Sequence, residues 1–264
     1  MIRFSILNSC LLSLAAMAAT TSHAQANLSA SQIVDKNLAA RGGQSAWHAV
    51  QTMTLEGTMD AGGKEDHSLP FVMKMKRPHK SRLEITFKDQ TALQVFDGTH
   101  GWKVRPFLNR NEVETFTANE TKMATATDEL DGPLVDYAAK GTKVALLGKE
   151  AVEGHPAYKL ELTMRSGQKR KVWIDAGTFL ELKADGEPRI LDGKPHAVSI
   201  FYRDYKAEHG LMIPHVWETA VFGVKQTHKI EVSKVAVNES LNDTLFDKPR
   251  LAATAAAVTV PKQP

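Results

Sequence analysis

Cysteine is almost missing from this chain of 264 residues: the one cysteine, Cys10, lies in the first apolar segment. Disulfides, cysteine-ligated metals and thiol chemistry are therefore excluded from the rest of the chain. A large excess of one charge is missing too, because 33 Lys and Arg residues face 30 Asp and Glu residues. The net charge of +3 is too small to drive binding to nucleic acid or to an anionic membrane without a local cluster.

The densest cationic stretches are residues 74–82 and 168–171. Lysine and arginine on strand edges and solvated faces are a common device against edge-to-edge association, and we interpret both stretches in this way. We expect no nucleic-acid partner.

Catalytic motifs are also lacking. The chain has no Gly-x-Ser-x-Gly turn, no phosphate-binding glycine loop and no dinucleotide fingerprint. Its ten histidines form no His-x-x-x-His or His-x-x-Glu-His pair. Acidic groups such as Asp128, Glu129 and Asp131 are interpreted as solvated carboxylates or helix caps. We expect no enzyme, no metal and no cofactor; a carboxylate hydrolase is the enzymatic alternative, because paired carboxylates need not be close in sequence.

The N-terminus has the pattern of an export signal. Arg3 precedes a mostly apolar stretch, 4–19, which is followed by small residues at 20–26. This pattern predicts a signal peptide over 1–24, with cleavage after Ala24 or Ala26; an uncleaved anchor helix is the alternative. An exported chain without disulfides fits the bacterial periplasm, where we expect this protein.

Residues 251–264 are rich in Ala, Thr, Val and Pro and almost uncharged, which predicts a disordered tail. Between signal and tail we find no linker and no change of composition. We therefore expect a single β domain over residues 25–250.

Within that domain the hydrophobic period predicts a short helical start and then strands. A helix is expected to open at 29–32 and to end at Gly42–Gly43, followed by a short turn around Trp47. About ten alternating segments follow, separated by turns at Asp97–Gly98, Ser166–Gly167, Asp185–Gly186 and Asp192–Gly193. The expected fold is mainly β, one large antiparallel sheet that curls or partly closes. The exception among these strands is 119–139, where the composition predicts one or two short helices with a break at Gly132–Pro133.

Seven methionines remain after the signal peptide, and most of them lie on the apolar phase of the expected strands. Methionine adapts its shape and is common where a surface accepts varied apolar partners, but it is also ordinary core filler. The composition leaves both interpretations open.

A family resemblance rests on four matched stretches: 72–78 (ending Lys76-Arg77-Pro78), 82–84, 96–102 (Asp97-Gly98 through Trp102) and Pro106. In order and spacing they resemble the outer-membrane lipoprotein-sorting (LolA-like) family, and 40–43 and 245–249 are also similar to the wider group. The resemblance implies an unclosed β-barrel lidded by a few short helices, with an apolar cavity for acyl chains. The chain is longer than the family's dedicated carrier, with extra sequence around 185–196.

The function implied is periplasmic binding and transport of lipoproteins or other acyl-chain lipids toward the outer membrane. Its partners would be the cargo and membrane donor or acceptor proteins, and we expect a monomer without a stable membrane span. The alternative is a lipid- or lipoprotein-sensing regulatory module of the cell envelope.

The cavity is expected on one face of the hairpin strands, because alternate residues share a face. Trp102, from the matched motif, is added to this face. The expected lining is Phe71, Met73, Met75, Leu83, Ile85, Phe87, Leu93, Val95 and Trp102.

Arg77 is the single polar residue expected at this site. It lies where a strand meets Pro78, which cannot donate to a sheet ladder, so the strand should end there. From the residues alone, Arg77 is an edge charge. The resemblance implies a lid contact instead, with backbone carbonyls supplied here by 119–139 and released when cargo enters.

Overall fold

The computed structural model describes residues 28–60, 68–127 and 130–250. The predicted signal peptide (1–24) and the predicted tail (251–264) lie outside the described residues.

Two short helices begin the described chain, as the sequence predicts. Helix α1 (Ala30–Ala40) starts at a capping box, in which the Ser29 side chain accepts from the Gln32 amide at 3.2 Å and the Gln32 side chain accepts from the Ser29 amide at 2.8 Å. Its apolar face, with Ile33 and Val34, is buried. Helix α2 (Gln44–Ala49) follows directly and buries Trp47.

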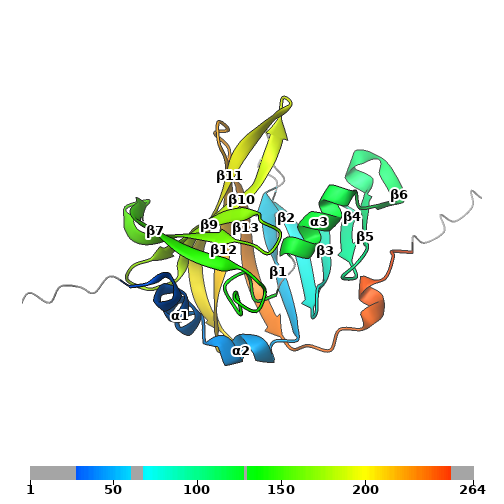
Figure 1. The fold of residues 1–264 in the computed structure, drawn as a ribbon. Coiled ribbons are helices and arrows are strands. Elements are labelled where there is room, and N and C mark those ends of the chain that lie inside the picture. The colour runs from blue at the N-terminus through cyan, green and yellow to red at the C-terminus, as the bar shows by residue number, and fades with distance from the viewer. Residues whose placement is uncertain (1–27, 61–67, 128–129, 251–264) are drawn as a thin grey trace, which may run out of the picture.

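Thirteen antiparallel strands form one sheet in the order β6-β5-β4-β3-β2-β1-β13-β12-β11-β10-β9-β8-β7 (Figure 1). Strands that are neighbours in sequence pair with each other, except β6 and β7, and β1 pairs with β13 as well as with β2. Strands β6 and β7 are the edges, so the sheet curls without closing, as expected. The strands are β1 (Thr52–Asp60), β2 (Ser68–Lys76), β3 (Lys80–Phe87), β4 (Gln90–Phe96), β5 (Gly101–Arg105), β6 (Arg110–Thr115), β7 (Lys143–Val152), β8 (His155–Thr163), β9 (Lys169–Asp175), β10 (Glu181–Leu191), β11 (Lys194–Glu208), β12 (Leu211–Val221) and β13 (His228–Val237).

The main core lies on the inner face of the curl. Met53 and Leu55 of β1 and Leu160 and Leu162 of β8 are buried there, together with the apolar face of α1. Helices α1 and α2 close one end of the sheet, and α3 (Ala118–Thr127) lies in front of β3 and β4 (Figure 1). Two single 3-10 turns complete the described elements, η1 (Pro106–Leu108) and η2 (Asp243–Phe246).

Three details correct the sequence predictions. The sheet has thirteen strands rather than about ten, because β6, β7 and β10 mix charged and small residues and alternate weakly. Asp185–Gly186 is no turn: Gly186 pairs with Val198 inside the sheet, where an added Cβ would come within 2.7 Å of the valine side chain. Of the helical region 119–139, only the first half is a helix, and residues after 130 form turns. The other three turns are confirmed.

Candidate functional site

The inner face is occupied by a turn-rich segment, residues 130–141, which we call the plug. It connects α3 to β7. Leu134 and Val135, at its centre, have no exposed surface and belong to the main core cluster. The plug is therefore held partly by apolar packing, yet it has no helix or strand of its own to keep it in place.

A polar latch ties the plug to the rest of the fold. The Arg77 guanidinium donates to the carbonyls of Val50 (2.8 Å) and Trp47 (3.0 Å) and to a carboxylate oxygen of Asp131 (2.8 Å). Lys140 donates to the other oxygen of Asp131 (3.0 Å), and the Asp131 side chain is only 4% exposed. One arginine thus joins the end of β2, the end of α2 and the plug.

Further contacts repeat this connection between the helices and the plug. The Asp136 carboxylate accepts from Gln44 and contacts the His48 ring, both on α2. Arg41 donates to the Asp131 carbonyl at 3.3 Å. The plug is therefore anchored by polar groups at its rim and by apolar groups at its centre.

A small hollow of about 220 Å³ lies between α3 and the sheet. Met73, Leu83, Phe116 and Met123 are among its lining residues. Helix α3 is fixed at its start, where Glu120 accepts from the Thr117 amide at 2.8 Å and from Lys103. Its weak amphipathicity and partly exposed Met123 indicate that little apolar packing holds it down.

A larger opening of about 670 Å³ lies on the other side of α3, beside the plug. Four permanent cations and one carboxylate line it, and Met164 adds an apolar side chain. We call it the basic mouth. Its lining is His79, Lys122, Thr125, Lys140, Thr142, Met164, Arg165, Ser166, Gln168, Arg170 and Glu187.

Most of the apolar residues expected in the cavity lie on the inner face. In the register of β2 and β3, Phe71 pairs with Ile85 and Met73 with Leu83. Five of the expected residues pack on or within the main core: Phe71, Met73, Met75, Leu83 and Ile85. Phe87 has the same phase and lies 5.7 Å, ring to ring, from Phe107.

Leu93 and Trp102 lie on the opposite face and line an outer pocket, so their expected place in the cavity is wrong. Val95 is buried and is among the residues that line the small hollow under α3, although its register partners Arg82 and Trp102 line the outer pocket. Strands β3 and β4 are joined by a two-residue turn, which pairs Leu93 with Glu84 and Val95 with Arg82. Because that turn exchanges odd and even positions, the residues of β4 that face inward are the even-numbered ones. Trp102 pairs with Val95 and lies on the outer face with Leu93.

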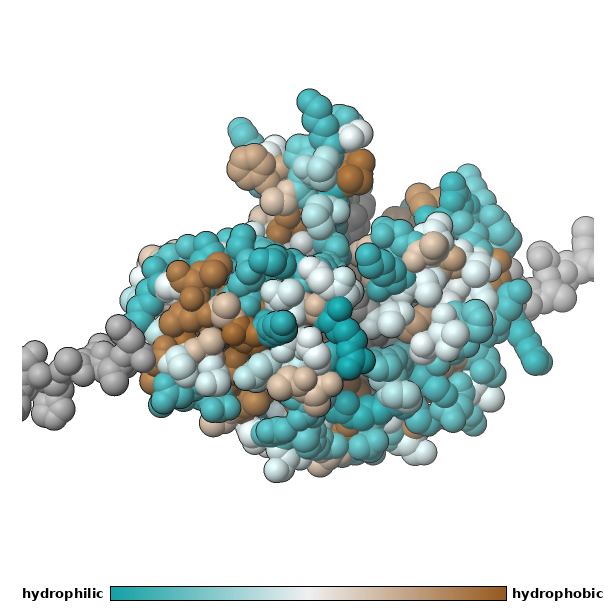
Figure 2. Space-filling model, in the orientation of Figure 1, coloured by the Kyte–Doolittle hydropathy of each residue, from teal (hydrophilic) through white to brown (hydrophobic). Residues whose placement is uncertain are grey.

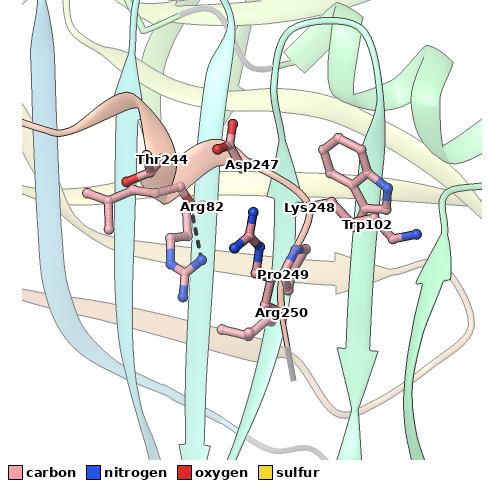
Figure 3. Close-up of a pocket in the computed structure, with 9 residues that line it drawn as sticks. Arg82, Trp102, Thr244, Asp247, Lys248, Pro249 and Arg250 are labelled. Carbon is pink, nitrogen blue, oxygen red and sulfur yellow. Dashed lines mark hydrogen bonds between the residues drawn. The ribbon is translucent and has the colours of Figure 1, made fainter. Parts of the chain in front are cut away.

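On this outer face a third pocket, of about 970 Å³, lies under the C-terminal segment (Figure 3). Leu93, Trp102 and Arg82 form its floor, and Arg82 donates to the Leu245 carbonyl at 3.1 Å. Lys76 and Lys80 reach Asp243 of the same segment at 3.0 Å. These cations of the 74–82 stretch thus bind the chain's own C-terminal segment, which agrees with a structural interpretation of the cluster.

Arg77 contacts the region 119–139 as expected, but through a different group. The carbonyls that it binds belong to α2, whereas the plug supplies the carboxylate of Asp131. The interpretation of Asp131 as a solvated or capping group is wrong, because it is buried between two cations. Sequence reasoning also missed Leu134, Val135 and Lys140; the only local signal was the Gly132–Pro133 break.

Within the described residues, no three His, Cys, Asp or Glu side chains gather closely enough to hold a metal ion. In the same part of the chain, no helix has the length and apolar character needed to span a membrane.

Three solved structures share this architecture. A LolA superfamily protein from Nitrosomonas europaea is 18% identical, with a TM-score of 0.54, and the match covers 84% of this chain and 99% of that one. A DUF1329 family protein from Desulfovibrio piger is 16% identical, with a TM-score of 0.55, over 84% and 98% of the two chains. A domain described as an outer membrane lipoprotein-sorting protein, from Vibrio parahaemolyticus, is 14% identical, with a TM-score of 0.54, over 82% and 95%. This chain has the LolA-like fold. No protein-family profile and no curated protein sequence matches it.

Within this LolA-like fold, Asp131 is the latch group whose ionisation responds to its partners. Burial acts to raise its pKa, but hydrogen bonds from Arg77 and Lys140, with their positive charges, outweigh burial and hold the pKa below the ordinary 3.8. The latch is therefore charged at neutral pH.

We expect the plug of this LolA-like protein to loosen only in acid. Because the pKa of Asp131 is lowered in the closed state, its ionised carboxylate stabilises that state. The stabilisation is complete at any pH above the ordinary carboxyl pKa, and it is lost as the pH falls through the lowered pKa. The uptake rate of an uncharged fluorescent acyl ester should be level from pH 7 to about pH 4 and rise below it. The Asp131→Asn variant should load fast at every pH. A rise between pH 7 and 6 in both proteins would assign the opening to a histidine instead.

Proposed function

We propose that the protein binds acyl chains on the inner face of its curled sheet, in place of the plug, and carries lipoproteins or other acyl lipids through the periplasm toward the outer membrane. The observation that carries the proposal is the plug itself: two fully buried apolar side chains, Leu134 and Val135, on a segment without regular structure. A segment of this kind can leave the core while the sheet stays intact.

The energetics favour exchange of the plug for an acyl chain. Exposing Leu134 and Val135 costs about 1.5–3 kcal/mol for each side chain. Removing an acyl chain of about 14 carbons from water gains roughly 10 kcal/mol, at about 0.8 kcal/mol for each CH₂. The difference stabilises the loaded state. Loading also breaks the latch bonds, and the free energy lost with them reduces the net stability of the loaded state, so that cargo can still be released.

The shape and composition of the site support the same proposal. The hollow under α3 and the basic mouth lie on either side of a helix that is weakly packed. Met73, Met123 and Met164 line these openings, and methionine side chains adapt to chains of different length and branching. Cations at the mouth suit a polar head group that remains in water. No chemical step and no cofactor is required.

Two further observations support the compartment and the class of cargo. The N-terminal sequence, outside the described residues, has the pattern of a secretory signal. One structure of the same fold carries a description as an outer membrane lipoprotein-sorting domain, and we extend that role to this chain as part of the proposal.

Co-purified lipid tests the proposal. Protein recovered from the periplasm without detergent and extracted with organic solvent should release acyl lipid, detected by mass spectrometry. The delipidated protein should then take up the uncharged acyl ester. Failure of both assays would contradict acyl binding. A pull-down from envelope extract should capture lipoproteins; a single regulatory protein in their place would favour the sensing role.

A further inference from the structure

Exposed large apolar residues are concentrated at one place in the described chain. Six are exposed, and three of these lie on two neighbouring hairpin ends: Phe222 (76%), Ile190 (66%) and Val224 (40%). The β10–β11 hairpin and the β12–β13 connection project from the sheet, away from α1 and α2 (Figure 1). Apolar side chains lie among hydrophilic ones on these projecting hairpins (Figure 2).

The two ends are joined and form one unit, residues 187–197 and 222–227, which we call the arm. The Phe222 amide donates to the Ala197 carbonyl at 2.8 Å, and His196 Nδ1 lies 2.9 Å from the Phe222 carbonyl. The arm includes the extra sequence around 185–196 that the family resemblance does not explain. Its tip projects away from the rest of the sheet (Figure 1), and only Glu187, at its base, reaches the lining of the basic mouth.

The arm is positively charged as well as apolar. Arg189, Lys194 and Lys225 are exposed and make no ion pair within the described chain, whereas Asp192 is the one exposed carboxylate of the arm. Glu187, the other carboxylate of the arm, lies at its base and is paired with Arg170 outside the arm, so the arm has three cations and two carboxylates and a net charge of +1, with the cations in excess at the tip. Other surface cations of this protein, such as Lys229 and Lys234, are paired with neighbouring carboxylates.

We propose that the arm docks the protein on a bilayer surface that contains anionic lipid. Phe222 and Ile190 would enter the head-group region, where aromatic and aliphatic side chains gain from partial burial, and the three cations would face lipid phosphates. Charge complementarity favours this occupant, because the unpaired cations surround the apolar tip.

Vesicle co-sedimentation tests the proposal on the mature full-length protein. The vesicles are phosphatidylcholine, with or without phosphatidylglycerol at about a third of the lipid. Wild type should bind the anionic vesicles at least about tenfold better than the neutral ones, and added salt should weaken this binding. A Phe222→Ser and Ile190→Ser double variant should lose about tenfold or more, and so should a Lys194→Glu and Lys225→Glu double variant.

Leu147→Ser is the matched control, because Leu147 is a half-exposed apolar residue on β7, outside the arm. It should bind like wild type. Equal vesicle binding by the arm variants and wild type would overturn the proposal. Wild-type protein that does not co-sediment with anionic vesicles would overturn it too. If wild type is a dimer and the Phe222→Ser and Ile190→Ser double variant is a monomer, the arm binds a second copy of the chain instead. Uptake of the uncharged acyl ester should be the same in all these variants, so failure here is distinct from failure of the proposed function.

Discussion

Replacing Arg77 by leucine should speed the loading of an acyl probe by at least about tenfold and weaken its onward transfer. The substitution removes three hydrogen bonds that join α2 and Asp131 to the end of β2. One hydrogen bond with a charged partner contributes about 1.5–3 kcal/mol, so losing the bond to Asp131 alone raises the open population roughly 10- to 150-fold. The open, loaded state is then no longer disfavoured, and cargo leaves it less readily.

The two rates are measured separately, as uptake of the fluorescent ester and as its release to acceptor vesicles. Arg105→Leu is the matched control. Arg105 also lies at the end of a strand, is paired with a carboxylate, Glu114, and is exposed to almost the same extent, 29% against 28%. If Arg77→Leu shows wild-type rates for both steps, Arg77 has only a structural role and the latch does not control loading or transfer.

A lysine on the inner face should abolish acyl uptake, whereas the same change on the outer face should not. Leu83 and Leu93 lie on neighbouring strands, β3 and β4, but point to opposite faces. In Leu83→Lys an ammonium group enters the hollow under α3. A bound alkyl chain would offer this charge no hydrogen bond and no counter-charge, so uptake should fall at least about tenfold. In Leu93→Lys the charge enters the outer pocket, and uptake should stay near the wild-type value.

Circular dichroism and thermal unfolding of both variants accompany the uptake assay. If Leu83→Lys loses the β-sheet signal, Leu83→Ser takes its place, because serine is polar without a charge. Equal loss of uptake in the Leu83 and Leu93 variants, with both folded, would show that the inner face is not the binding surface.

The comparison of these two leucines also shows what the sequence could predict. Alternation identified most of the strands and placed Phe71, Met73 and Leu83 on one face, because β2 and β3 meet in a register that keeps odd residues together. It misplaced Leu93 because a two-residue turn shifts the phase of β4 by one position. Local pattern gives the faces of one strand, but the relation between strands depends on the turn that joins them.

The contact between Arg77 and Asp131 could not be predicted from local sequence, for a different reason. Arg77 was recognisable from its position before Pro78, but its partner Asp131 is 54 residues away in sequence. The carboxylate becomes buried only because the plug crosses the inner face of a completed sheet. In sequence, Asp131 follows Asp128 and Glu129 closely, and a stretch of this composition is typical of a solvated segment.

The single junction between β1 and β13 has a consequence for how the chain folds. Each half of the sheet is a meander of neighbouring strands, which needs only short loops, whereas Met53 meets Val237 across almost the whole domain. Contacts that close so long a loop form late and slowly. During folding the N-terminal half can therefore be complete while β1 is still an open edge, and an open edge is a template for pairing with other chains. Until β13 pairs with β1, that edge is where a folding helper would have most to protect.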